Sequence, residues 1–277
     1  IGDFISGVIM YDETIRQSDD SGKRFVELLA MSDILSGIKV DKSTHDLAGA
    51  PGEFITEGLD GLRDRLADYY SMGARFAKWR ALLTVGDGRP SDYAIHTNAH
   101  ALGRYAILCQ EQGLVPIVEP EILMDGVHDI DDCRLATKRS LTVVFEELVA
   151  QSVDLSGIVL KPNMVISGSD ASSRASSTEV ARQTIDCLLE TVPAEVPGVA
   201  FLSGGQGDEE SVVNLDEINK IANSERIPWE LTYSYGRGLQ AAPLAKWLGK
   251  NENVLAGQVE FQRRGLDSSA AREGVFT

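Results

Sequence analysis

The chain has 277 residues, of which 43% are hydrophobic and 25% are charged, and its formal net charge is -16. This length suits one large α/β barrel or two ordinary domains, and no apolar run approaches the ~18 residues of a membrane span. The negative charge argues against general nucleic-acid binding, because a phosphate backbone selects clustered Lys and Arg, but a local group of cations can still form a pocket for an anionic substrate.

Seven short runs of β-branched and aliphatic residues alternate along the chain with longer amphipathic stretches. Each stretch is long enough for a crossover helix, and crossover connections join parallel strands. We therefore predict a parallel sheet with strands within residues 3–10, 35–40, 74–83, 114–122, 156–162, 197–205 and 229–236.

Helical periodicity and helix-end signals mark the stretches between these runs. Leu62 and Leu66 recur at helical spacing, and Gly73 follows as a C-terminal stop. Ser176 followed by Glu179 is typical of a capping box, which predicts another helix start.

Charged or polar residues end successive strands about 40 residues apart, at Lys39, Lys78, Glu119, Lys161 and Ser203. Units of this size around a closed sheet describe a (β/α)8 or TIM barrel, an α/β fold whose active sites lie at the C-terminal ends of the strands. Only seven strands are visible. We therefore expect the first strand to be missing from this chain, and residues 1–277 to form a single barrel domain.

The strand ends carry charged side chains in the same relative register. Strand alternation places pairs of polar residues on one face of each strand: Lys39 with Asp41, Lys78 with Arg80, Glu119 with Glu121, and Lys161 with Asn163. The alternative is a network of salt bridges around the rim. Lys is almost never buried without a reason, so the shared register favours a pocket for an anionic substrate.

Lys161 ends an apolar run, "GIVLKPNMV", and is a candidate for Schiff-base catalysis. Burial and a neighbouring ammonium both lower the pKa of a lysine, and a neutral amine can attack a carbonyl. Glu119 ends the preceding strand, so it could transfer protons to and from the resulting intermediate.

Two glycine-containing segments favour phosphate binding. Ser203 and Gly204 follow one predicted strand, and Ser234, Gly236 and Arg237 follow the next. Bare backbone N–H groups can approach an anion closely, Arg can grip phosphate bidentately, and the last two strands of a barrel are the usual place for such a site.

The histidines and cysteines add little chemistry. His96 and His100 lie four residues apart without the glutamate of a zinc protease motif, so we predict no metal site. Cys109, Cys133 and Cys187 show no CxxC spacing. We expect them to be small core residues in a reducing, cytoplasmic protein.

Together these residues resemble class I fructose-bisphosphate aldolase, and the matching motifs run in order across nearly the whole chain. They are "GIKVDK" (37–42), "LDGL" (59–62), "FAKWR" (76–80), "VPIVEPEIL" (115–123), "LKPNMV" (160–165), "FLSGGQ" (201–206), "PWELTYSYGRGLQ" (228–240) and "GKNEN" (249–253).

The resemblance implies roles for individual residues. Lys161 matches the lysine that forms the imine with the ketose, Glu119 the principal acid/base, and Lys78 the lysine that positions the sugar and stabilises developing negative charge. The implied substrate and phosphate contacts are Lys39, Arg80, Glu121, Ser203, Gly204, Ser234, Gly236 and Arg237.

The resemblance also implies cleavage of fructose 1,6-bisphosphate in glycolysis and gluconeogenesis, with no cofactor, in a cytoplasmic homotetramer; a plastid location stays open. It implies a sugar phosphate as the partner, and neither nucleic acid nor membrane. The family's first-strand aspartate and its C-terminal tail have no counterpart in this chain. The open alternatives are a Schiff-base aldolase for another phosphosugar, and a non-catalytic scaffold with an aldolase fold.

Overall fold

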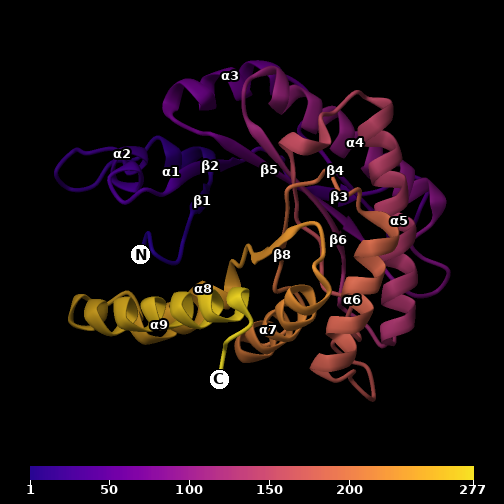
Figure 1. Cartoon of the computed structure of the whole chain (residues 1–277). Coiled ribbons are helices and arrows are strands. Elements are labelled where there is room, and N and C mark those ends of the chain that lie inside the picture. The colour runs from indigo at the N-terminus through magenta and orange to yellow at the C-terminus, as the bar shows by residue number, and fades with distance from the viewer.

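The computed structural model describes all 277 residues and contains a curled, all-parallel sheet of seven strands (Figure 1). Each strand pairs in parallel with the next one along the chain, apart from an inserted hairpin, as the crossover connections predict. The strands, in sheet order, are β1 (Gly7–Met10), β2 (Leu35–Lys39), β5 (Phe76–Leu83), β6 (Val115–Ile122), β7 (Val159–Leu160), β8 (Gly198–Phe201) and β9 (Glu230–Tyr233).

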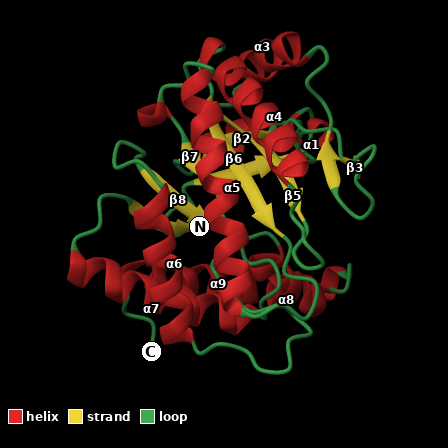
Figure 2. Cartoon of the chain, turned by 90° about the vertical axis from the view of Figure 1, so that its right-hand side faces the viewer, coloured by secondary structure: helices red, strands yellow, loops and turns green.

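Helices follow the strands and cover the outside of the sheet (Figures 1 and 2). The predicted stop at Gly73 is confirmed, because this residue ends α3 with φ 113°. Ser176 accepts a hydrogen bond from the Glu179 N–H and thereby caps α6. The helices are α1 (Asp12–Ile15), α2 (Phe25–Ala30), α3 (Leu62–Met72), α4 (Asp92–Glu111), α5 (Ile130–Ala150), α6 (Ser177–Thr191), α7 (Asp208–Glu225), α8 (Arg237–Trp247) and α9 (Val254–Glu273), with short 3₁₀ helices at Leu155–Gly157 and Asn251–Asn253.

β1 and β9 are the two end strands of the sheet and do not pair with each other. The Tyr233 hydroxyl of β9 donates a hydrogen bond to the Phe4 carbonyl, so a side chain connects the two ends. In Figure 1 the ring of helices is correspondingly open between α1 and α2 on one side and α8 and α9 on the other. The architecture is that of a TIM-type α/β barrel with seven of its strands, as predicted.

A short antiparallel hairpin, β3 (Thr44–Asp46) with β4 (Phe54–Thr56), interrupts the alternation and is absent from the sequence prediction. The Thr56 hydroxyl donates to the Arg80 carbonyl over 2.7 Å, which ties the hairpin to β5. The buried carboxylate of Glu53 accepts from the N–H of Ser91, 2.7 Å away, at the start of α4. The hairpin therefore connects β5 to the start of α4.

The core lies between the sheet and its helices. Trp79 is fully buried and packs on Tyr105 of α4, with ring centroids 5.7 Å apart, so it faces outward from the barrel. Cys109, Cys133 and Cys187 are free and buried, as predicted for small core residues. None of the helices combines the length and the apolar content that crossing a membrane requires.

Candidate active site

Two lysines flank one glutamate at the centre of the barrel. The carboxylate of Glu119 lies with Oε2 2.7 Å from Lys78 Nζ and with Oε1 2.9 Å from Lys161 Nζ. The side chain of Glu119 is 3% exposed, and those of Lys78 and Lys161 are 10% and 9% exposed. The structure thus brings together the three residues predicted to be catalytic, from β5, from β6 and from the residue after β7.

The strand register explains this convergence. Side chains alternate between the two faces of a strand, so Lys78 faces the barrel interior because Trp79 faces α4. Arg80 of β5 is the register partner of Glu119 of β6. Lys161 extends the ladder beyond β7, since its N–H donates to the Val118 carbonyl over 2.8 Å.

The pKa values of Glu119 and Lys161 are both lowered, but for different reasons. Burial of Glu119 opposes its ionisation, but the charges of Lys161 and Lys78 outweigh burial and lower the pKa of the carboxyl. Burial lowers the pKa of Lys161, and the charge of Lys78 lowers it further, against the opposing effect of Glu119. The site therefore favours an ionised glutamate beside a lysine that gives up its proton more easily than usual.

A second set of ion pairs lies beside this cluster. Lys39 pairs with Asp41, and Arg80 pairs with Glu121. The Lys39 ammonium also lies 5.7 Å from the ring centroid of Tyr11, in a pocket of about 430 Å³ that includes Asp41. Asp41 is not among the predicted substrate contacts, although strand alternation places it on the same face as Lys39.

The segments predicted to bind phosphate meet at the start of α8. A Cβ on Gly238 would lie 3.2 Å from Ser203 Oγ, and one on Gly204 would lie 3.1 Å from Glu121 Oε1. The N–H of Ser234 donates to the Phe201 carbonyl over 2.8 Å, which keeps the ends of β9 and β8 together.

Gly236 and the exposed Arg237 begin α8, whose N-terminus has no side-chain cap and no acidic residue in its first turn. Free N–H groups at such a helix start favour anions. The arrangement therefore suits a phosphate held between Ser203 and the start of α8.

Two expectations about the strand ends are wrong. Lys78 and Glu119 lie within β5 and β6 and do not end them, because these strands continue to Leu83 and Ile122. Asn163 does not share the pocket-facing side of Lys161, because β7 ends at Leu160 and strand alternation does not apply beyond it. Its Oδ1 instead accepts from the Ile122 N–H at 3.1 Å, and its Nδ2 donates to Thr137 Oγ1 at 3.1 Å. Asn163 is buried and joins β6 to α5.

The segment that follows β7 is buried although it forms no regular structure: every residue from 161 to 168 is buried. Hydrogen bonds from its backbone reach neighbouring elements, at 2.9 Å from the Val165 N–H to Thr184 Oγ1 and at 2.9 Å from the Gly168 N–H to the His128 carbonyl. A segment that is buried and hydrogen-bonded in this way can keep Lys161 in place, although β7 is only two residues long.

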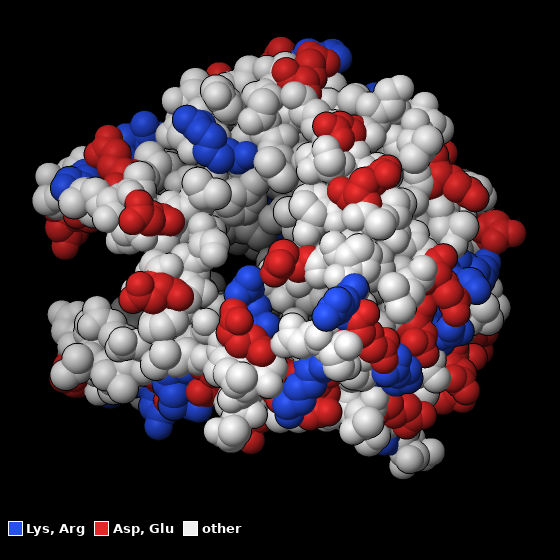
Figure 3. Space-filling model, in the orientation of Figure 1, with Lys and Arg blue, Asp and Glu red and all other residues white.

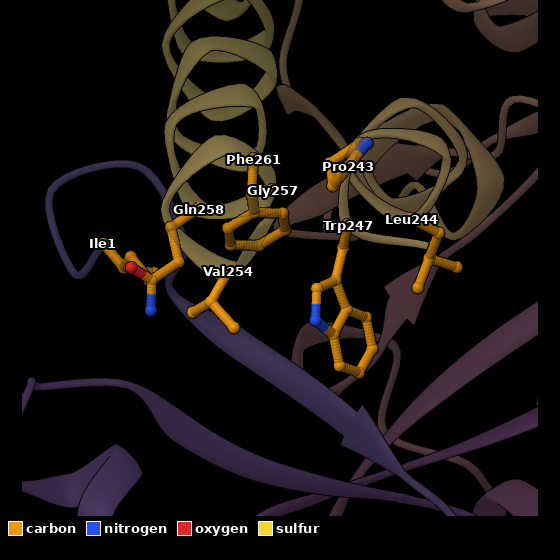
Figure 4. A pocket seen from close by; sticks show the side chains of 8 residues that line it. All are labelled: Ile1, Pro243, Leu244, Trp247, Val254, Gly257, Gln258 and Phe261. Carbon is orange, nitrogen blue, oxygen red and sulfur yellow. The ribbon is translucent and has the colours of Figure 1, made fainter. Parts of the chain in front are cut away.

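An apolar pocket of about 290 Å³ lies between α8 and α9 and includes Trp247 and Phe261 (Figure 4). No acidic or basic side chain lines it, so it offers no acid, base or nucleophile. In the face shown in Figure 3 the molecule is hollowed near its centre, and both acidic and basic side chains lie around the hollow and over the outer surface. The lysine–glutamate cluster, and not this apolar pocket, is therefore the candidate active site.

The fold and this cluster define the chain as an α/β-barrel enzyme with a lysine-centred site. The family model for fructose-bisphosphate aldolase class-I matches residues 1–277. The chain belongs to the class-I fructose-bisphosphate aldolase family, whose members are lyases.

Similar proteins agree over nearly the whole chain. It is 52% identical to fructose-bisphosphate aldolase 4, cytosolic, of Arabidopsis thaliana, over 99% of this chain and 69% of that protein. It is 53% identical to a probable fructose-bisphosphate aldolase class 1 of Xanthomonas axonopodis pv. citri, over 100% of this chain and 82% of that protein. A solved fructose-bisphosphate aldolase of Plasmodium falciparum superposes with a TM-score of 0.97 at 45% identity, covering 100% of this chain and 79% of that one.

Proposed function

We propose that this chain catalyses the reversible aldol cleavage of fructose 1,6-bisphosphate through a Schiff base on Lys161, without a metal ion, in glycolysis and gluconeogenesis. The observation that carries the proposal is the Glu119 carboxylate, held 2.7 and 2.9 Å from the amines of Lys78 and Lys161 in a buried setting. Family membership supports the substrate.

Lys161 starts the reaction as a nucleophile. Its amine, with a pKa lowered by burial, attacks the C2 carbonyl of the open-chain ketose and forms a carbinolamine. Glu119 transfers the protons that allow the C2 oxygen to leave as water. The product is an iminium ion, and the ammonium of Lys78 stays available to hold the sugar oxygens.

The iminium ion then accepts the electrons of the broken bond. Glu119 takes the proton from the C4 hydroxyl, the C3–C4 bond breaks, and its electron pair moves through C2 to the nitrogen. Glyceraldehyde 3-phosphate leaves, and a neutral enamine remains on Lys161. The enamine takes up a proton at C3, and water hydrolyses the iminium to release dihydroxyacetone phosphate and the free amine.

The two phosphates require two cationic ends of the site. We assign the C1-phosphate to Ser203, Gly204, Gly236 and Arg237 with Ser234 beside them, because a helix start without acidic residues stands there. Lys39 is the proposed contact for the second phosphate. The Arg80–Glu121 pair supports the sugar between them.

We further propose that residues 1–277 form a single catalytic domain, and that the enzyme is a cytoplasmic homotetramer. The names of the plant relatives, which describe cytosolic enzymes, support the compartment. Sedimentation velocity of the purified protein measures the oligomeric state directly.

Borohydride reduction in the presence of dihydroxyacetone phosphate tests the imine. We expect mass spectrometry to find the reduced adduct on Lys161. Lys161→Arg should lose cleavage and trapping while the protein stays folded, because Arg keeps the charge but cannot become a neutral nucleophile. Lys138→Arg, at an exposed position of α5, is the matched control and should behave like the wild type. An adduct on another lysine, or turnover by Lys161→Arg, would contradict the proposal.

A further inference from the structure

A fully buried arginine of α9 connects the starts of two other helices. Arg264 is 1% exposed. Its Nε donates to the Gly238 carbonyl over 3.0 Å, and its Nη2 donates to the Asp208 carbonyl over 2.6 Å. Gly238 lies in the first turn of α8, and Asp208 is the first residue of α7.

No carboxylate fully neutralises this guanidinium. The Asp267 carboxylate lies 4.0 Å from Arg264 Nη1, and it also pairs with the exposed Arg263 at 2.8 Å. Burying a charge without a close partner is costly. A buried cation held mainly by backbone carbonyls therefore calls for a role beyond packing.

The location of the charge suggests that role. A helix N-terminus carries a partial positive charge, and the start of α8 has neither a side-chain cap nor an acidic residue. Arg264 adds a full positive charge next to this helix start, because its guanidinium is hydrogen-bonded to the Gly238 carbonyl. The helix start and the buried guanidinium are both positive, so together they favour an anion near Gly238.

The same arginine links the two helix starts that follow the loops containing Ser203 and Tyr235. Gly238 approaches Ser203 so closely that a Cβ would lie 3.2 Å from its hydroxyl oxygen. Tyr235, just before α8, is buried and donates to the Ser211 carbonyl of α7 over 2.8 Å. α7 follows β8 and α8 follows β9, so a link between the two helix starts also links the loops in front of them.

We propose that Arg264 is the positioning residue of the C1-phosphate site: it holds the loop containing Ser203 against the start of α8 and supplies the buried charge that favours the phosphate. This inference rests on the proposed function, which assigns the phosphate to that place. Arg264 does not touch the substrate.

Imine trapping with two ketones separates positioning from general damage. Dihydroxyacetone phosphate carries the phosphate and dihydroxyacetone lacks it, and both can form the imine on Lys161. Arg264→Met should raise the half-saturating concentration of dihydroxyacetone phosphate by about tenfold or more, the usual scale for losing hydrogen bonds to a charged group. The value for dihydroxyacetone should change by less than about twofold, since it makes no use of the phosphate site.

Two variants serve as controls. Arg263→Met removes a neighbouring but exposed arginine of the same helix and should leave both ketones at wild-type values. Arg264→Lys keeps the charge but cannot make both hydrogen bonds in the same geometry, so it should give an intermediate loss for the phosphorylated ketone alone. It also keeps the test decisive if Arg264→Met does not fold.

Inorganic phosphate provides a measurement that needs no imine. It should raise the thermal midpoint of the wild type and of Arg263→Met, and raise that of the Arg264 variants less. Equal phosphate stabilisation in all folded variants, or equal losses for both ketones in the Arg264 variants, would overturn the inference. Failure of the wild type to trap either ketone would instead remove the proposed Schiff-base function, while the phosphate measurement would still decide the role of Arg264.

Discussion

The reactivity of Lys161 should respond in opposite directions to the loss of its two charged neighbours. Glu119→Gln removes the negative charge 2.9 Å from Lys161 Nζ, so more of the amine becomes neutral. Lys78→Met removes a positive charge that lowers the pKa of Lys161, so less of the amine becomes neutral. We therefore expect Glu119→Gln to raise the neutral fraction of the Lys161 amine and Lys78→Met to lower it.

The distance sets the magnitude for the glutamate. At an effective dielectric constant of about 20, opposite charges 2.9 Å apart attract by about 6 kcal/mol. If relaxation and water leave only a quarter of this, about 1.4 kcal/mol remains, which is a tenfold change in the ratio of neutral to charged amine. Because both groups are buried, little further screening is expected.

Competitive labelling with trace acetic anhydride measures this ratio without relying on catalysis. At pH 7 to 8 the peptide containing Lys161 should be labelled about tenfold faster in Glu119→Gln than in the wild type, and more slowly in Lys78→Met. Glu111→Gln, which removes an exposed acid on α4, should leave the rate unchanged. Equal rates in all variants, or changes of the same sign in both, would refute the electrostatic account of the lysine.

Three further outcomes concern stability. A Cβ at Gly37 would overlap the ring of Phe76, so Gly37→Ala should cost about 1–3 kcal/mol in the free energy of unfolding by denaturant, whereas Gly198→Ala, with ordinary contacts at 3.4 Å or more, should cost much less. Asn163→Ala leaves the buried N–H of Ile122 without an acceptor, so it should lower the free energy of unfolding by about 1–3 kcal/mol in the same assay. Because the pKa of Glu119 is lowered in the folded protein, its ionised form stabilises the fold above the unfolded-state pKa, and this contribution is lost as the pH falls through the folded-state pKa. The difference in thermal midpoint between the wild type and Glu119→Gln should therefore become smaller at acid pH. A difference that stays constant with pH would contradict this account.

The strands and the lysine–glutamate cluster were predictable because short-range patterns determine them. Aliphatic runs marked all seven strands, and simple alternation placed Lys78 inward once Trp79 faced a helix. The rim of salt bridges considered as an alternative is in part real, since Lys39 and Arg80 are paired. Lys39 ends β2 and Arg80 lies within β5, and both pairs lie beside the buried cluster, so pairing and a pocket are compatible.

The missed features depend on contacts between distant segments. Asn163 lies beyond the end of β7, where Pro162 supplies no backbone N–H and alternation gives no guidance. Arg264 stands in a charged stretch beside Arg263, and only the packing of α9 against α7 and α8 makes one of the two buried. The strands of the β3–β4 hairpin have three residues each, too few to show a period.

The buried irregular segment after β7 has a consequence for hydrogen exchange. Its amides at Val165 and Gly168 bond to Thr184 and to the carbonyl of His128, so they should exchange slowly although no sheet ladder protects them. Their exchange reports the opening of the contacts with α6 and with the loop before α5. The exchange rates of these amides would thus show how often the segment next to Lys161 detaches from its neighbours while the rest of the barrel stays folded.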